Sequence, residues 1–183
     1  MSSQIKDALM GCLEIPLFMK TGATRFQNTI QAAKTSFLVP ILVIFPVAEV
    51  AKVNSDFTDH SYIWLLGFFA MMLALNMLFF FGASYACMVA LEKKDKFPAY
   101  ITSMNWLSLT SLVINMPFLL LVYFGIYSYD EMYNLFIFLI LFGTTYQAFL
   151  ITHLLRINWM LGAAISIMGI LIDDGIRQLL FSL

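Results

Sequence analysis

Three amide side chains lie inside long apolar stretches of the sequence, where a polar group without a partner is costly. Asn76 is at the centre of the second stretch and Asn115 is midway along the third, shortly before Pro117. Gln147 lies beyond the middle of the fourth stretch. Because an amide in hydrocarbon must be hydrogen-bonded, we expect all three to face protein rather than lipid. They either line a polar path for a solute or join helices by hydrogen bonds that each contribute under about 2 kcal/mol.

A compact charged cluster lies in the last apolar stretch and consists of Asp173, Asp174 and Arg177. The arginine follows the two acids at the three- and four-residue spacings that share a helix face. Charges this close to a membrane indicate function by default. However, about 24 Å of helix separates them from Ile157, which predicts a position near one membrane interface. We therefore favour a local ion pair at that interface over a proton or cation site.

The remaining reactive residues predict neither an enzyme nor a metal centre. Cys12 and Cys87 are far apart and lack the spacing of a zinc site or a redox pair. No serine, cysteine or acid accompanies His60 or His153 in a nucleophile pattern, and the glycines form no phosphate-binding loop. We expect no catalytic residue, no metal and no cofactor. The formal net charge of -1 gives no reason to expect a nucleic-acid partner.

The elements that position the amides and the charged cluster are predicted to be membrane-spanning helices. The chain is 61% hydrophobic and 11% charged, against about 45 to 50% apolar and about 25% charged residues in ordinary globular proteins. A span needs about 20 residues, and five segments meet that requirement: about 35–53, 62–91, 99–127, 132–155 and 157–181. Short connections predict antiparallel neighbours. The predicted fold is all-α, a single membrane helix bundle over residues 1–183.

The amino-terminal segment predicts a short amphipathic helix ahead of the spans. Ser2 or Ser3 suits its start and Pro16 its end. Its apolar residues have the spacing that lines one helix face, at Ile5, Ala8, Leu9, Cys12 and Leu13. The helix either lies in the membrane interface or packs onto the bundle, and the sequence leaves both possibilities open.

Small residues predict a close contact between the fourth and fifth spans. The fourth span contains Gly143 followed by Thr144 and Thr145. The fifth contains a longer series, Gly162, Ala163, Ala164, Ser166 and Gly169. Small side chains allow helix backbones to approach closely, so packing explains both segments without a ligand.

The basic residues are sorted unevenly among the connections and predict an orientation. With a cytoplasmic amino terminus, the inner side holds eight of the ten: Lys6, Lys20, Arg25, Lys34, Lys93, Lys94, Lys96 and Arg156. The positive-inside rule then places the carboxyl terminus outside. Lys93, Lys94 and Lys96 set this topology, and they are also predicted to contact anionic lipid headgroups.

The order of these features resembles the Yip1-type membrane domain, and most closely its short bacterial relatives. Three segments carry the resemblance: Thr24-Arg25-Phe26 through Lys34, Lys94-Asp95-Lys96-Phe97-Pro98-Ala99-Tyr100 through Asn105-Trp106, and Thr145-Tyr146-Gln147. The resemblance implies five spans, a cytoplasmic amino terminus and an outward carboxyl terminus, in a bacterial inner membrane. Eukaryotic members have a long cytoplasmic region and take part in vesicle traffic with small GTPases, whereas about 34 residues precede the first span here.

Two functions are consistent with the sequence. The first is a non-enzymatic scaffold or accessory protein in membrane organisation or trafficking, whose partners are the lipid bilayer and either other membrane proteins or further copies of the chain. The second is a small transporter or channel whose polar path is lined by Asn76, Asn115 and Gln147. Internal repeats would have favoured transport, but five spans do not divide into equal halves.

Overall fold

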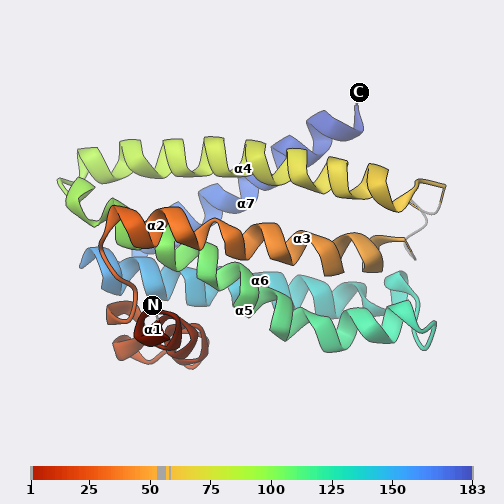
Figure 1. Cartoon of the computed structure of the whole chain (residues 1–183), viewed down its shortest axis with the longest axis horizontal. Coiled ribbons are helices and arrows are strands. Elements are labelled where there is room, and N and C mark those ends of the chain that lie inside the picture. The colour runs from red at the N-terminus through yellow and green to blue at the C-terminus, as the bar shows by residue number, and fades with distance from the viewer. Residues whose placement is uncertain (1, 53–56, 58, 183) are drawn as a thin grey trace.

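The computed structural model describes residues 2–52, 57 and 59–182, and within them it is built from helices (Figure 1). The amino-terminal segment contains α1 (Ser2–Glu14) and a 3₁₀ turn, η1 (Lys20–Thr24). The spans are formed by α2 (Ile30–Ser36) with α3 (Leu38–Ala51), then α4 (Tyr62–Ala90), α5 (Phe97–Tyr123), α6 (Tyr129–Leu155) and α7 (Trp159–Phe181). A second 3₁₀ turn, η2 (Lys94–Lys96), leads into α5.

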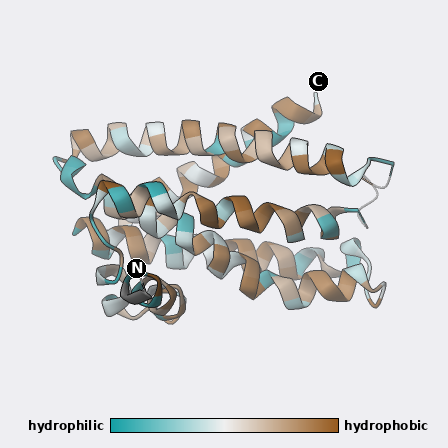
Figure 2. Cartoon of the chain, viewed as in Figure 1, coloured by the Kyte–Doolittle hydropathy of each residue, from teal (hydrophilic) through white to brown (hydrophobic). Residues whose placement is uncertain are grey.

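Five helical segments are long and apolar enough to cross a membrane, and this confirms the predicted all-α membrane bundle. Figure 2 shows apolar residues along these segments and hydrophilic residues gathered towards their ends. The protein is therefore a multi-pass integral membrane protein. The third span ends at Tyr123 rather than at the predicted Tyr127. The predicted end of the first span, Val53, lies outside the described residues.

The apolar stripe formed by Phe26, Ile30, Ala33 and Phe37 allows the helix of the first span to begin near Thr24 instead of near residue 35, but the structure does not continue it that far back. Arg25–Thr29 is irregular, and α2 begins only at Ile30. A break at Phe37 then separates α2 from α3. Pro40 accounts for this break, because a proline lacks the N–H that would bond to the carbonyl of Ser36 and its ring crowds that carbonyl.

Polar side chains cap the starts of four of the five spans, and α5 begins with a proline in its first turn instead. The side-chain oxygens of Thr29, Ser61 and Asn158 each accept a hydrogen bond from the backbone N–H three residues ahead, at 3.2, 3.2 and 3.0 Å. Ser128 forms a complete capping box with Glu131 at the start of α6. These caps satisfy backbone donors that the helix itself cannot satisfy, and so they fix where the spans begin.

The five spanning segments form a ring in which each packs mainly against two neighbours. The contacts run from α3 to α5, α5 to α6, α6 to α7, α7 to α4 and α4 back to α3. One end of the ring carries α1, the α4–α5 connection and the α6–α7 connection, and we call it the basic end (Figure 1). The other end, called the opposite end, carries the α5–α6 turn. In the same view α7 crosses obliquely behind α4.

The amino-terminal helix packs on the bundle, one of the two arrangements that the sequence left open. Figure 1 shows α1 end-on, so its axis is roughly perpendicular to the spans. Thr110 on α5 donates to the Cys12 carbonyl at 3.2 Å, and the Cys12 thiol lies 3.3 Å from the Trp106 carbonyl. Burial raises the pKa of that thiol to about 11, so it stays protonated. Another face of α1 remains apolar and exposed, at Ile5, Leu9, Met10 and Leu13.

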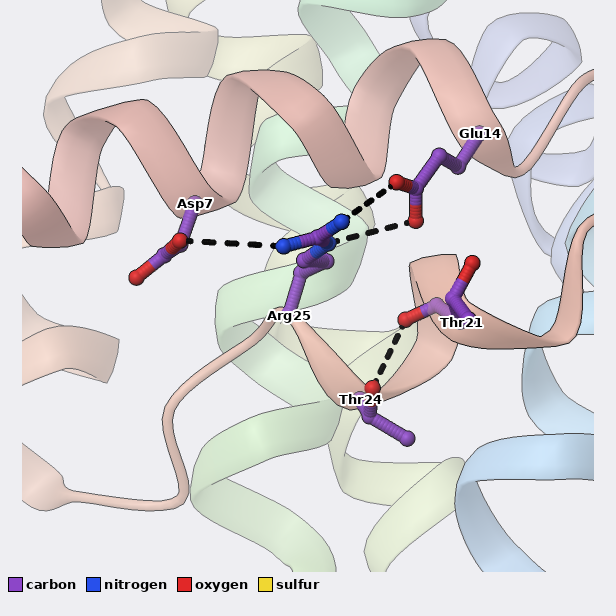
Figure 3. Close-up of polar contacts among 5 residues, drawn as sticks. All are labelled: Asp7, Glu14, Thr21, Thr24 and Arg25. Carbon is purple, nitrogen blue, oxygen red and sulfur yellow. Dashed lines mark hydrogen bonds and ion pairs between the residues drawn. The ribbon is translucent and has the colours of Figure 1, made fainter.

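A bidentate ion pair ties α1 to the segment that leads into the first span (Figure 3). Arg25 donates to the two carboxylate oxygens of Glu14 at 2.6 and 3.2 Å, and Asp7 lies 4.0 Å from the same guanidinium. These hydrogen bonds hold the pKa of Glu14 below its ordinary value. The pair therefore stabilises the fold at neutral pH and is lost only as the pH falls through that lowered pKa.

The predicted close contact between the fourth and fifth spans is confirmed by the packing of α6 against α7. A Cβ placed on Gly162 would lie 2.9 Å from the backbone carbonyl of Ala148 and would collide with the Thr152 hydroxyl. Ser166, one turn further along, donates to the carbonyl of Thr144 at 3.0 Å. The small residues therefore allow direct contact between the two backbones, as their spacing indicated.

Gly162→Ala should destabilise the bundle, because the new methyl group meets the α6 backbone, which cannot move aside as a side chain can. We expect the free energy of unfolding to fall by about 1 to 3 kcal/mol, which is the usual effect of overpacking a core. Gly175→Ala is the matched control on the same helix, because a Cβ there meets nothing within 4 Å. Reversible unfolding in mixed detergent micelles measures both variants, and equal stabilities would contradict this description of the α6–α7 contact.

Candidate functional site: a polar cavity inside the helix ring

A half-open cavity of about 810 Å³ lies inside the ring, and all five spanning segments contribute to its wall. Its volume falls within the range of about 300 to 1,000 Å³ that is usual for small-molecule sites. The polar lining residues are Asn76 on α4, Asn105, Ser108, Ser111 and Asn115 on α5, Thr144, Tyr146 and Gln147 on α6, and Asp173, Asp174 and Arg177 on α7. The structure thus brings together in one cavity the three amides and the charged cluster that the sequence indicated separately.

The α5 wall contains polar residues that sequence reasoning missed, with the exception of Asn115. Asn105, Ser108, Ser111 and Asn115 follow one another at three- and four-residue spacings, and all four line the cavity. That spacing places side chains on one face of a helix. A polar stripe on an otherwise apolar helix was therefore visible in the sequence, but only Asn115 was selected from it.

Asn76 and Asp173 join α4 to α7 across the cavity. The Asn76 amide donates to a carboxylate oxygen of Asp173 at 2.7 Å. Asn76 lies at the midpoint of α4, so Asp173 is also near the middle of the bundle. The sequence placed Asp173 near one interface, whereas its bond to Asn76 places it at the depth of the middle of α4.

Gln147 lies where α5, α6 and α7 meet. Its amide oxygen accepts a hydrogen bond from Ser166 on α7 at 2.9 Å, and its amide nitrogen lies 3.2 Å from the Met104 sulfur on α5. Next to it, the Tyr146 and Ser111 hydroxyl groups bond to each other at 2.7 Å. These bonds fix the α6 side of the cavity.

Asn115 behaves differently from the other two amides, because its hydrogen bond stays within its own helix. The Asn115 amide donates to the carbonyl of Ser111, one turn back, at 2.7 Å. This bond does not join two helices. The amide of Asn115 is thus hydrogen-bonded without bridging helices, and the residue lines the cavity.

Asp174 and Arg177 form the ion pair expected from their spacing. The guanidinium donates to Asp174 at 2.7 Å, and Gln178 donates to the same carboxylate at 2.7 Å. The Arg177 side chain is 59% exposed although the residue also lines the cavity. Arg177 therefore lies where the wall of the cavity meets the surface of the bundle.

The basic end of the cavity is closed by tightly packed side chains. Tyr100 is fully buried and its hydroxyl pairs with that of Ser84 at 2.9 Å. Phe80 and Phe81 line the cavity and pack against the Tyr100 ring, with centroid distances of 6.2 and 6.3 Å. A cavity of this volume, with a largely apolar wall and a limited number of polar groups, has the form of a solute-binding site.

A smaller cavity of about 220 Å³ lies between α3 and α4 and shares several lining residues with the central one. Among them are Asn76, Ser108 and Asp173. The hydrogen-bonded pair of Asn76 and Asp173 is therefore reached from both spaces.

The other residues selected from the sequence lie apart from the cavity. Lys93, Lys94 and Lys96 lie in the α4–α5 connection at the basic end, where Asn28 fastens the turn by donating to the Asp95 carbonyl at 2.8 Å and accepting from the Ala99 N–H at 3.1 Å. Among the described residues, no group of three or more histidine, cysteine or acidic side chains is placed to hold a metal ion.

Comparison with known proteins adds no relative to this description. No protein-family model matches the chain, and no curated protein or solved structure is significantly similar to it.

Proposed function

We propose that the protein binds a small polar solute in the central cavity and passes it across the membrane, as a small transporter or channel. The observation that supports this most is that Asn76, Asn115 and Gln147, on three different helices, border one cavity near the middle of the bundle. Polar groups are expensive at membrane depth, and where they surround a space they mark solute or ion pathways. Asn115 supports the proposal further, because its hydrogen bond does not join helices and so helix-to-helix bonding does not explain its presence.

The proposed orientation places the basic end in the cytoplasm, with the amino terminus inside and the carboxyl terminus outside, in a bacterial inner membrane. Its basis is the concentration of lysine and arginine in the connections at the basic end. The seal formed by Tyr100 and Ser84 would then face the cytoplasm. In this proposal the solute enters from the outer side, as it does in an alternating-access protein whose inner side is closed.

Leucine in place of any one of the three amides should slow solute passage strongly while leaving the protein folded. Proteoliposomes challenged with glycerol, glycine or methylammonium and followed by light scattering measure entry of each probe. We expect Asn76→Leu, Asn115→Leu and Gln147→Leu each to slow the conducted probe by about tenfold or more, which corresponds to about 1.4 kcal/mol in the barrier.

Val113→Leu is the control for this experiment, because Val113 is on α5 near Asn115 but is 62% exposed on the outer surface of the bundle. It should conduct at the rate of the unmodified protein. Entry no faster than through protein-free liposomes for every probe would contradict the proposal.

The second candidate is a scaffold or accessory role in membrane organisation or trafficking. The layout that resembles the Yip1-type domain supports it, as does the exposed apolar face of α1, which offers a surface for lipid or another membrane protein. A scaffold requires no conduction, and the amide substitutions would then leave its association with other membrane components unchanged.

A further inference from the structure

We propose that the solute is a small organic cation whose ammonium group is held by the Asp173 carboxylate. This inference rests on the proposed function and specifies its substrate class. Asp173 lines the central cavity near the middle of the bundle and is reached from both cavities. A charge in such a place is normally compensated by a partner of opposite sign.

The charged groups that line the cavity leave one negative charge in excess. Two acids, Asp173 and Asp174, and one base, Arg177, give the lining a formal net charge of -1. Arg177 bonds to Asp174. Asp173 bonds instead to Asn76, a neutral amide that orients the carboxylate without compensating its charge. The position left for a positive charge is therefore beside Asp173.

The remaining wall suits an organic cation better than a metal ion. A bare Ca²⁺ or Mg²⁺ ion needs about six oxygen ligands at about 2.0 to 2.6 Å, and the described residues contain no such group of acids. The cavity is much larger than an ion, and aromatic rings from Phe80, Phe81 and Tyr146 line it. Aromatic faces attract ammonium groups and also cover the apolar body of an organic solute.

Three probes of similar shape and different charge test this inference on the full-length protein in nanodiscs: phenethylammonium, neutral phenethyl alcohol and anionic 3-phenylpropanoate. Equilibrium binding should favour the cation over the other two by about tenfold or more. Asp173→Asn keeps the shape of the side chain and removes its charge. We expect it to weaken cation binding by about tenfold or more and to leave the neutral probe unchanged.

The matched control is Asp130→Asn, which makes the same substitution at an exposed acid in the first turn of α6, outside the cavity lining. It should retain the preference for the cation. A preference that survives in Asp173→Asn, or binding of none of the three probes, overturns the inference.

The two proposals fail in different ways. If glycerol or glycine enters proteoliposomes in a manner that depends on Asn115 while cation binding is independent of Asp173, the proposed function stands and the substrate class is wrong. If no probe is conducted but phenethylammonium binds through Asp173, the cation site stands and the proposed function is wrong.

Discussion

Tyr100→Ala should destabilise the bundle more than any surface substitution does. We expect the free energy of unfolding to fall by about 3 to 5 kcal/mol. Tyr100 is fully buried and packs against Phe80 and Phe81, which form part of the cavity wall. Removing its ring leaves a void at the basic end and deprives the buried Ser84 hydroxyl of its partner. Denaturant unfolding in mixed micelles measures the stability, and vesicles containing the fraction that remains folded should leak solute.

Conservative variants separate the ring from its hydroxyl group. Tyr100→Phe should cost about 1 to 3 kcal/mol, because it keeps the ring but leaves the Ser84 hydroxyl buried without a partner. Adding Ser84→Ala should recover much of that loss, since both polar groups are then absent. Tyr133→Ala, at a position that is 61% exposed, should change stability by only about 0.5 kcal/mol. Equal losses of stability for Tyr100→Ala and Tyr133→Ala would contradict the claim that Tyr100 is part of the packing that closes the basic end.

The seal and the cavity together divide the bundle into two unlike halves. Fully buried side chains gather towards the basic end, including Tyr100, Met88, Leu150 and Leu155. Polar side chains surround open space near the middle, where Asn76 meets Asp173. Opening the packed half while closing the accessible half would expose the same residues to the other side of the membrane. Transport by alternating access requires such a change.

The spanning helices were predictable from sequence because they follow from the apolar composition of consecutive residues. Residues 62–91 contain no charge, and α4 ends within one residue of the predicted boundaries. The break at Phe37 was missed, although Pro40 and its effect on the carbonyl four residues back were present in the sequence. Apolar composition predicts that a segment spans a membrane, but it does not predict where the helix is interrupted.

The cavity was not predictable, because it depends on which helices become neighbours. Asn76 and Asp173 are 97 positions apart in the sequence, and nothing local indicates that they meet. The oblique path of α7 behind α4 is likewise set by packing rather than by composition (Figure 1). The same holds for Ser111 and Tyr146, whose hydroxyl groups meet at 2.7 Å across two helices.

A cysteine introduced into the cavity should react rapidly with a charged thiol reagent, whereas one on the lipid-facing side should not. Ser108→Cys is nearly isosteric and lies on the wall of both cavities. Val113→Cys is on the same helix but faces outward, with 62% exposure. A charged reagent needs water to reach the thiol and to support the thiolate, so we expect rates that differ by about 100-fold or more. Both native cysteines, Cys12 and Cys87, are first replaced by alanine.

The labelling rate of Ser108→Cys in sealed vesicles of known orientation therefore tests the central claim, that the helix ring encloses a hydrated cavity closed at the basic end. A membrane-impermeant methanethiosulfonate is added to one side at a time. Rapid labelling from the side of the opposite end, slow labelling from the side of the basic end, and an inert Val113→Cys are the predicted result. An inert Ser108→Cys from both sides, or equal rates for Ser108→Cys and Val113→Cys, would contradict the claim.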